Sequence, residues 1–350
     1  MTELINFVWL YISSVEKISY SNSSIYFNES FLNLHNYIKK SDLDNLFYLI
    51  DSKIYDIYFD SFNKLENVLV IPADESSKTL SYSSILIEKL LDLGANKTSY
   101  LIGVGGGVIC DVTGFIASIF MRGINFAFVP TTLLSITDAS LGGKNGVNFN
   151  SIKNIVGTIN EPDFIIIDLS FLKSLELEEY YNGFAEIIKH ACIGSSKLFS
   201  FLEKIDIDYK SEKFFSKILK ESISIKLNLV SRDLKDLGQR KKLNFGHTFG
   251  HAIESKNKIS HGKAISLGII FACHISNKLG YLAKDKIKRI KHLLEKFNLP
   301  TEISEIDKSE LLTFISKDKK AVKKNIDFIV LEDIGKANII NLSIDKIVYE

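Results

Sequence analysis

The chain has 350 residues, enough for two domains of ordinary size, and its hydrophobic content of 46% supports a large core without disulfide bonds. Its net charge of +1, with no run of lysine and arginine interleaved with aromatic residues, argues against a nucleic-acid partner. The apolar run from Leu4 to Ile12 is too short to span a bilayer and lacks the basic start of a signal peptide, so no membrane partner is expected. The three cysteines form no CxxC motif, and we expect a soluble, cytoplasmic protein with reduced thiols.

The first part of the chain predicts alternating strands and helices. Short apolar runs rich in β-branched residues predict strands in residues 67–75, 99–107, 124–132 and 162–170. A 3.6-residue apolar period with a glycine stop predicts a helix in residues 83–94, and another helix follows Asp111. This alternation is typical of a parallel, doubly wound α/β sheet.

After about residue 170 the pattern changes to long helical periods with few strand signals. A short hairpin is expected only near the end, in residues 327–340. We therefore predict an α/β domain in residues 1–170 and an α-helical domain in residues 171–350.

A glycine-rich turn, Gly103 to Asp111, follows one predicted strand and opens a helix. Such a turn lets backbone N–H groups approach a pyrophosphate, although tight packing explains it about as well. It is neither the spaced G-x-G-x-x-G fingerprint nor a Walker loop, because no Gly-Lys-Ser/Thr closes it. The turn favours a nucleotide with two phosphates and argues against ATP hydrolysis.

A dense polar stretch runs from Met121 to Pro162 and gathers cationic and small polar groups around glycine turns. An anionic ligand would suit it, and a solvated surface loop is the alternative. Its candidate residues are Arg122, Thr131, Thr132, Asp138, Lys144, Lys153 and Asn154.

Three of the 7 histidines, His247, His251 and His261, fall within fifteen residues. His247 and His251 are spaced i, i+4, which places them on one helix face and within reach of one divalent metal. Surface or capping histidines are the alternative. Thr248 stands where the HExxH metalloprotease motif requires glutamate, so a peptidase is excluded.

Glu186 and Lys189 lie three residues apart and project from one helix face. A simple i, i+3 ion pair would explain them, or Glu186 could complete a His₂Glu zinc site with an open position. Arg240 and Asn244 fall one turn apart just before His247 and extend the polar face.

Eight segments, taken in order, resemble the 3-dehydroquinate synthase family of the sugar phosphate cyclase superfamily. They are ESSK, GGGVICD, RGINFAFVPTTLL, DASLGGKNGVN, KNIVG, GFAEIIKH, RKKLNFGHTFGHAIE and HGKA. The resemblance runs from about Glu75 to Lys320. It implies an N-terminal Rossmann-like, NAD-binding α/β domain and a C-terminal all-α metal- and substrate-binding domain, with the active site in the cleft between them. It also implies a homodimer.

The resemblance assigns roles to individual residues. Glu186, His247 and His261 match the ligands of one divalent metal, zinc or cobalt. The NAD contacts are matched by Asp51, Glu75, Lys78, Gly106, Gly107, Val108, Asp111, Thr131, Thr132, Lys144, Lys153, Phe171, Leu172, Lys173 and Ser174. The substrate is matched by Arg122, Lys226, Arg240, Asn244 and one of Lys319 and Lys320, and the catalytic groups are Asp138, Lys144, Asn154, Lys189 and His251.

The implied reaction converts 3-deoxy-D-arabino-heptulosonate 7-phosphate, a small sugar phosphate, to 3-dehydroquinate and phosphate in the shikimate pathway. It proceeds by transient NAD-dependent oxidation, β-elimination of phosphate, re-reduction, ring opening and intramolecular aldol closure. The alternatives are another sugar phosphate cyclase, a metal- and NAD-dependent polyol dehydrogenase, and an inactive NAD-binding scaffold.

Five positions depart from the family pattern: Cys110 and Ile152 replace glycines, Asn145 a threonine, and Lys263 and Asp236 glutamates. None removes a group with a direct chemical role, so we expect activity. We expect these five positions to affect the affinity for NAD and the way neighbouring groups orient the metal ligands.

Overall fold

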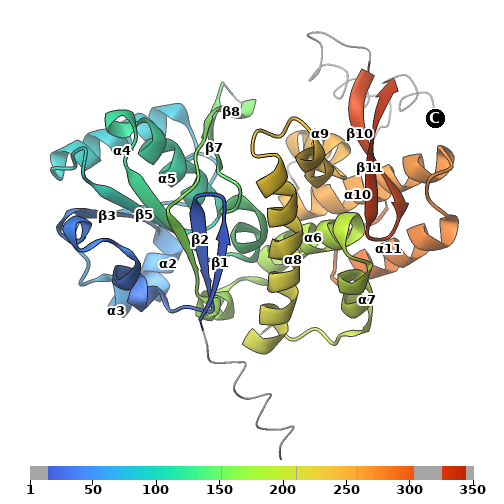
Figure 1. Ribbon diagram of the computed structural model, residues 1–350, viewed down its shortest axis with the longest axis horizontal. Helices are drawn as coiled ribbons and strands as arrows, with labels where there is room; N and C mark the ends of the chain where they lie inside the picture. The colour runs from blue at the N-terminus through green and yellow to red at the C-terminus, as the bar shows by residue number, and fades with distance from the viewer. Residues whose placement is uncertain (1–14, 151, 210, 258, 303–324, 344–350) are drawn as a thin grey trace, which may run out of the picture. The chain divides into compact units, whose positions relative to one another are not determined.

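The computed structural model describes residues 15–150, 152–209, 211–257, 259–302 and 325–343 (Figure 1). These residues form two compact units. The first comprises the described residues up to Leu175 together with Asp208–Lys217, and the second comprises Glu176–Ile207 and the described residues from Ile218 onward.

A seven-stranded sheet with the order β1-β2-β9-β6-β5-β3-β4 forms the centre of the first unit. All neighbouring strands are parallel except β1 and β2, which form an antiparallel hairpin at one edge. The strand bounds are β1 Glu16–Tyr20, β2 Ser23–Phe27, β3 Leu46–Asp51, β4 Val68–Ile71, β5 Tyr100–Gly105, β6 Asn125–Pro130 and β9 Phe164–Ile167. The predicted parallel α/β sheet is confirmed.

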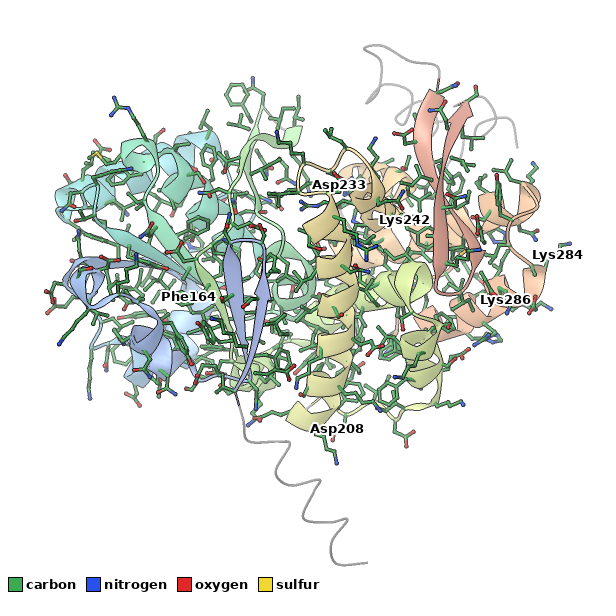
Figure 2. The ribbon with its side chains drawn as sticks, viewed as in Figure 1. Phe164, Asp208, Asp233, Lys242, Lys284 and Lys286 are labelled. Atoms are coloured by element: carbon green, nitrogen blue, oxygen red, sulfur yellow. The ribbon has the colours of Figure 1, made fainter. Side chains whose placement is uncertain are left out.

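Burial on both faces explains why the central strands are continuous apolar runs. Every residue of β3, β5 and β9 is buried. One face packs a core cluster that includes Ile50, Ile102, Val129 and Phe164, the last labelled in Figure 2.

Helices and a second hairpin complete the first unit. The helices are α2 Ser52–Ile57, α3 Phe59–Phe62, α4 Leu80–Asp92 and α5 Gly107–Ile119, with 3-10 turns at Phe31–Tyr37, Lys40–Asn45, Phe120–Arg122 and Leu169–Ser174 and a π turn at Ser135–Ala139. The polar stretch contains an antiparallel hairpin of β7 (Lys144–Phe149) and β8 (Ile152–Ile159), which the sequence patterns do not predict. Because β8 is exposed along nearly its whole length, it carries no buried-face alternation.

The second unit is helical apart from one hairpin. Its helices are α6 Leu177–Gly194, α7 Ser196–Lys204, α8 Glu212–Arg232 (of which the residues from Ile218 belong to this unit), α9 His247–Asn257, α10 His261–Lys278 and α11 Lys284–Lys296, with a 3-10 turn at Gln239–Asn244. The expected C-terminal hairpin is confirmed as β10 (Asn325–Asp333) paired with β11 (Lys336–Ser343). The described part of the chain contains no helix long and apolar enough to cross a membrane.

All three cysteines are free and buried, Cys110 in the first unit and Cys192 and Cys273 in the second. Burial raises the pKa of each thiol above its usual value. The thiols are therefore protonated and inert at neutral pH.

Candidate active site

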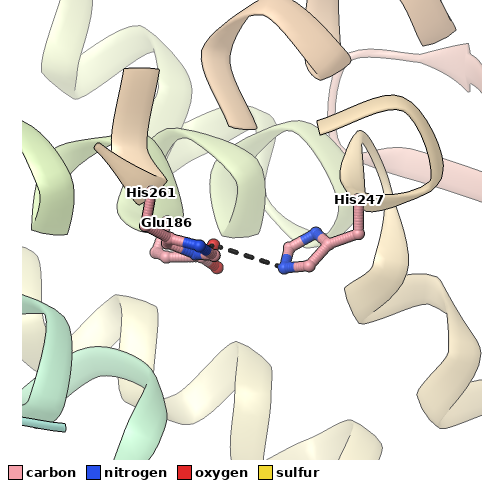
Figure 3. A group of neighbouring side chains, drawn as sticks. All are labelled: Glu186, His247 and His261. Carbon is pink, nitrogen blue, oxygen red and sulfur yellow. Dashed lines mark hydrogen bonds and ion pairs between the residues drawn. The ribbon is translucent and has the colours of Figure 1, made fainter. Parts of the chain in front are cut away.

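Three helices of the second unit bring together a carboxylate and two imidazoles. These are Glu186 of α6, His247 of α9 and His261 of α10, and we call this group the metal site. Glu186 Oε1 lies 3.2 Å from His261 Nε2 and 3.5 Å from His247 Nε2. One potential ligand atom from each residue falls within 4.8 Å of the others. Figure 3 shows His247 projecting toward the pair formed by Glu186 and His261.

The geometry of the metal site suits a tetrahedral ion. With zinc–ligand bonds near 2.0–2.1 Å, neighbouring ligands of a tetrahedron are about 3.3 Å apart, close to the two measured separations. Two imidazoles and one carboxylate also form a known catalytic zinc set that leaves one position open. The residues present therefore fit a divalent metal.

Charge and burial set the protonation of the metal site. Burial alone would raise the pKa of Glu186, but Lys189, His247 and His261 together hold it well below its usual value. Burial and then Lys189 lower the pKa of His247 well below its usual value, so this imidazole is neutral. Its Nδ1 lies 3.2 Å from the carbonyl oxygen of Phe245, and a hydrogen bond there directs the Nε2 lone pair toward Glu186.

The pKa of His261 is shifted in the opposite direction to that of His247. Burial lowers its pKa, but Glu186 and Glu254 outweigh that effect and raise it to about 9. Its Nδ1 lies 3.5 Å from Glu254 Oε2, which orients Nε2 toward Glu186. A metal ion would displace the proton of His261, because a ligating imidazole must be neutral.

His251 lies next to the metal site without joining its ligand group. Its ring centroid is 5.1 Å from that of His247 and 6.4 Å from that of His261. His251 is exposed, whereas His247 and His261 are largely covered. The i, i+4 spacing correctly predicts that His247 and His251 are neighbours, but the group whose ligand atoms lie close together consists of His247, His261 and Glu186.

The candidate substrate cations of the second unit are buried. Lys189 and Lys226 are 1% and 4% exposed, and Lys189 forms an ion pair with Glu186. Arg240 is 3% exposed, and its Nη1 donates to the carbonyl oxygen of Leu234 at 2.7 Å. Asn244 is exposed. Lys319 and Lys320 lie outside the described residues.

Asp233, labelled in Figure 2, fixes the loop that carries Arg240. Its carboxylate accepts hydrogen bonds from the backbone N–H groups of Leu237 at 2.9 Å, Gly238 at 2.6 Å and Arg240 at 3.1 Å. Three such bonds to one carboxylate define the loop, and sequence reasoning missed this residue.

In the first unit the candidate NAD residues follow the carboxyl ends of five parallel strands, and we call them the strand-end residues. They lie at or after the ends of β3 (Asp51), β4 (Glu75, Lys78), β5 (Gly106, Gly107, Val108, Asp111), β6 (Thr131, Thr132) and β9 (Phe171, Leu172, Lys173, Ser174). The carboxyl ends of parallel strands share one edge of the sheet, which is where ligands bind in open α/β folds.

The turn after β5 leaves little room for side chains. A Cβ on Gly106 would lie 3.1 Å from Thr132 Cγ2, and one on Gly107 would lie 3.3 Å from Ala139 Cβ. Gly106 precedes α5, so the free backbone N–H groups of the first helical turn are available to an anion. This backbone cradle fits a pyrophosphate group.

Some strand-end residues have side chains that are buried and not accessible to a ligand. Phe171 and Leu172 are 3% and 1% exposed and pack in the interior, so NAD contacts there would use the backbone, Lys173 or Ser174. Asp51 caps α2 by accepting from the N–H of Lys53, and burial raises its pKa above the usual value.

Lys78 and Asp111 form an ion pair in the first unit. Burial raises the pKa of Asp111, and the ammonium group of Lys78 partly offsets this effect. The pair joins the loop after β4 to the first turns of α5.

Asn148, on β7, connects several candidate residues and was also missed. Its Oδ1 accepts from the N–H of Asn154 at 2.9 Å, and its Nδ2 donates to Glu75 Oε2 at 2.6 Å. Its own N–H donates to the carbonyl oxygen of Lys78 at 2.8 Å. Asn154 has a positive φ of 54°, a conformation that asparagine tolerates and this hydrogen bond supports.

A cavity of about 410 Å³ lies beside the β7–β8 hairpin and is lined by Asp111, Lys144, Asn154 and neighbouring hairpin residues. Lys153 is exposed on β8, and Asp138 lies in the π turn. Arg122 is exposed in a turn with three consecutive positive φ angles, at Met121, Arg122 and Gly123.

Comparison with known proteins identifies the family of the chain. The model of the 3-dehydroquinate synthase N-terminal domain matches residues 68–182, and that of the 3-dehydroquinate synthase C-terminal domain matches residues 183–321. A 3-dehydroquinate synthase from Thermoanaerobacter pseudethanolicus is 37% identical over 337 residues, which cover 92% of this chain and 95% of that protein. The chain belongs to the 3-dehydroquinate synthase family.

Other members and neighbours support the assignment. A 3-dehydroquinate synthase from Dictyoglomus turgidum is 40% identical over 281 residues, 79% of each chain. A crystal structure of 2-deoxy-scyllo-inosose synthase with carbaglucose-6-phosphate, NAD⁺ and Co²⁺ superposes with a TM-score of 0.85 at 27% identity, covering 96% of this chain and 98% of that one. The resemblance to the sugar phosphate cyclases is thus confirmed, and the fold is shared by cyclases with different names.

Three of the five departures from the family pattern are well-packed or paired side chains, and a fourth, Ile152, is exposed. Cys110 is fully buried in α5. Asn145 is 4% exposed and its Nδ2 donates to the carbonyl oxygens of Gly143 and Asn160. Lys263 forms an ion pair with Glu178 at 3.0 Å. Ile152 is 55% exposed on β8.

Proposed function

We propose that the protein converts 3-deoxy-D-arabino-heptulosonate 7-phosphate to 3-dehydroquinate and phosphate, the second step of the shikimate pathway that leads to chorismate and the aromatic amino acids. It is a carbon–oxygen lyase that requires NAD and one divalent metal. The observation that carries the proposal is the clustering of Glu186, His247 and His261 within 4.8 Å in a chain of the 3-dehydroquinate synthase family.

The two cofactors are held by different parts of the chain. The N-terminal domain binds NAD through the strand-end residues together with Lys144 and Lys153. The C-terminal domain binds the metal through the metal site. The boundary between the two domains lies at about residue 170. When bound, the NAD would supply a hydride acceptor and donor for the substrate, and the metal would supply a Lewis acid that polarises a substrate oxygen.

The remaining residues bind the substrate and move its protons. The carboxylate, phosphate and hydroxyl groups of the substrate are bound by cationic and amide side chains: Arg122, Lys226, Arg240, Asn244 and Lys319 or Lys320. Lys189 and Arg240 are buried cations, whose hydrogen bonds to anions are strong because little water competes. His251 is exposed beside the metal site and relays protons, while Asp138, Lys144 and Asn154 orient the reacting groups.

Three finer properties also belong to this proposal: zinc or cobalt as the metal, a homodimer as the assembly and the cytoplasm as the location. Metal analysis of the protein purified from its source, sedimentation analysis and cell fractionation test them in turn.

The deciding experiment mixes the purified protein with NAD⁺, zinc and the heptulosonate phosphate. We expect release of phosphate and formation of dehydroquinate without net accumulation of NADH. Sustained production of NADH would show a polyol dehydrogenase instead. Turnover of another sugar phosphate, with none of the heptulosonate, would show a different cyclase.

A further inference from the structure

The first turn of α10 is capped by a side chain of α6. Ser260 precedes α10, but its hydroxyl donates to Glu178 Oε1 at 2.8 Å and makes no capping bond to the helix. The N–H of Gly262, one of the donors that a helix start leaves without an internal partner, instead donates to Asn182 Oδ1 at 3.0 Å. Asn182 thus does from 80 residues away what an N-cap side chain does locally.

The same face of α6 contacts His261 at two levels. Asn182 and Glu186 are spaced i, i+4, so their side chains lie one above the other on α6. Asn182 binds the backbone directly after His261, while Glu186 Oε1 lies 3.2 Å from the His261 ring. One ligand of the metal site is therefore tied to the helix of another through both its backbone and its side chain.

Packing makes the contact at Asn182 specific. Asn182 is 7% exposed, and its Nδ2 also lies 3.4 Å from Glu179 Oε1. A Cβ on Gly262 would lie only 2.4 Å from the Cα of Asn182, so the start of α10 rests directly on the backbone of α6. Asn182 Oδ1 is the acceptor that the structure gives the Gly262 N–H in this close contact.

We infer that Asn182 is a positioning residue for the metal: its hydrogen bond to Gly262 fixes the backbone at His261 and so forms the Glu186–His261 ligand pair in advance of metal binding. This inference rests on the metal site of the proposed function. Outer groups that orient metal ligands change metal affinity roughly 10- to 100-fold when removed.

The test measures zinc affinity of the full-length, metal-free protein by competition with a chromogenic chelator. Asn182→Leu keeps the side-chain volume and removes the acceptor, and we expect its affinity to fall roughly 10- to 100-fold. Asn182→Asp keeps an acceptor oxygen for the Gly262 N–H and adds a negative charge that attracts zinc, so its affinity should lie well above that of Asn182→Leu.

Asn277→Leu is the matched control, because Asn277 donates to the carbonyl oxygen of Leu282 at 2.6 Å near the other end of α10. It should lower thermal stability but leave zinc affinity unchanged. The visible spectrum of bound Co²⁺ should change for Asn182→Leu and not for Asn277→Leu, because its intensity reports ligand geometry.

Two results would overturn the inference: wild-type zinc affinity in Asn182→Leu, or equal losses in Asn182→Leu and Asn277→Leu. Failure of the wild-type protein to bind zinc would overturn the metal site itself, and with it this inference.

Discussion

The two units hold their candidate site residues in contrasting ways. In the second unit the three residues of the metal site come from helices, and their side chains are 0%, 13% and 26% exposed. In the first unit the strand-end residues lie where strands give way to loops and helices, and several are buried. Glu75 among them is exposed, as are Lys144 and Asn154 near the cavity. An ion only a few ångströms from its ligands requires side chains fixed by packing, whereas a dinucleotide requires an open surface and accessible backbone groups.

The largest effect should come from removing one residue of the metal site. His247→Ala leaves two ligands, and we expect zinc binding and dehydroquinate formation to be abolished. Chelator competition and a phosphate-release assay measure the two effects. His292→Ala, an exposed histidine on α11, is the control and should retain both. Turnover by His247→Ala at the wild-type rate would refute a metal role for this residue.

In the first unit, breaking the Lys78–Asp111 pair should affect stability as well as NAD binding. Lys78→Met leaves a largely buried carboxylate without its cation, and we expect the free energy of unfolding to fall by about 2–3 kcal/mol at pH 7.

The pH dependence of this variant has a defined sign. A raised pKa of Asp111 means that the folded state binds more protons than the unfolded state, so stability falls as pH rises through its titration. Loss of Lys78 raises this pKa further, and urea unfolding between pH 4 and 7 should show a steeper fall than in the wild type. The double variant with Asp111→Asn should lose the steeper slope, and its persistence would assign the effect to another group.

A smaller, more local effect is expected at Asn148. Asn148→Ala removes its hydrogen bonds to Glu75 and Asn154, and we expect NAD affinity to fall about tenfold, as titration calorimetry would measure. Asn148→Asp keeps the acceptor for Asn154 but places a carboxylate against Glu75, so it should bind NAD no better than the alanine variant. Asn150→Asp adds the same charge at an exposed position of the same hairpin and should bind normally.

The smallest effect on turnover should come from Cys110. Cys110→Gly should leave turnover intact, because the side chain is fully buried in α5. It should still lower the free energy of unfolding by about 2 kcal/mol, because removal of a fully buried side chain loses apolar contacts and leaves a cavity. Thermal unfolding and the phosphate-release assay separate the two outcomes, and lost turnover in a stably folded variant would contradict the expectation.

The buried sheet was predictable because its strands are continuous apolar runs, whereas only the family resemblance selects His261 instead of His251 to join His247 and Glu186. Local spacing links His247 to His251, but Glu186 is 75 residues from His261, and no periodicity connects them. The β7–β8 hairpin was not predictable because exposed positions such as Ile152 and Ile155 lie on both faces of β8. Asn148, Asn182 and Asp233 were missed because their roles are hydrogen bonds to backbone groups or partners that only the folded chain brings near.

The buried thiols give each unit its own chemical reporter. Cys110 reports on the first unit, and Cys192 and Cys273 report on the second. Since a protonated, covered thiol reacts with an alkylating reagent only after the surrounding structure opens, the labelling rate of each cysteine measures the opening of its own unit. Mass spectrometry of labelled peptides would then show whether NAD protects Cys110 and zinc protects Cys192 and Cys273, without any engineered probe.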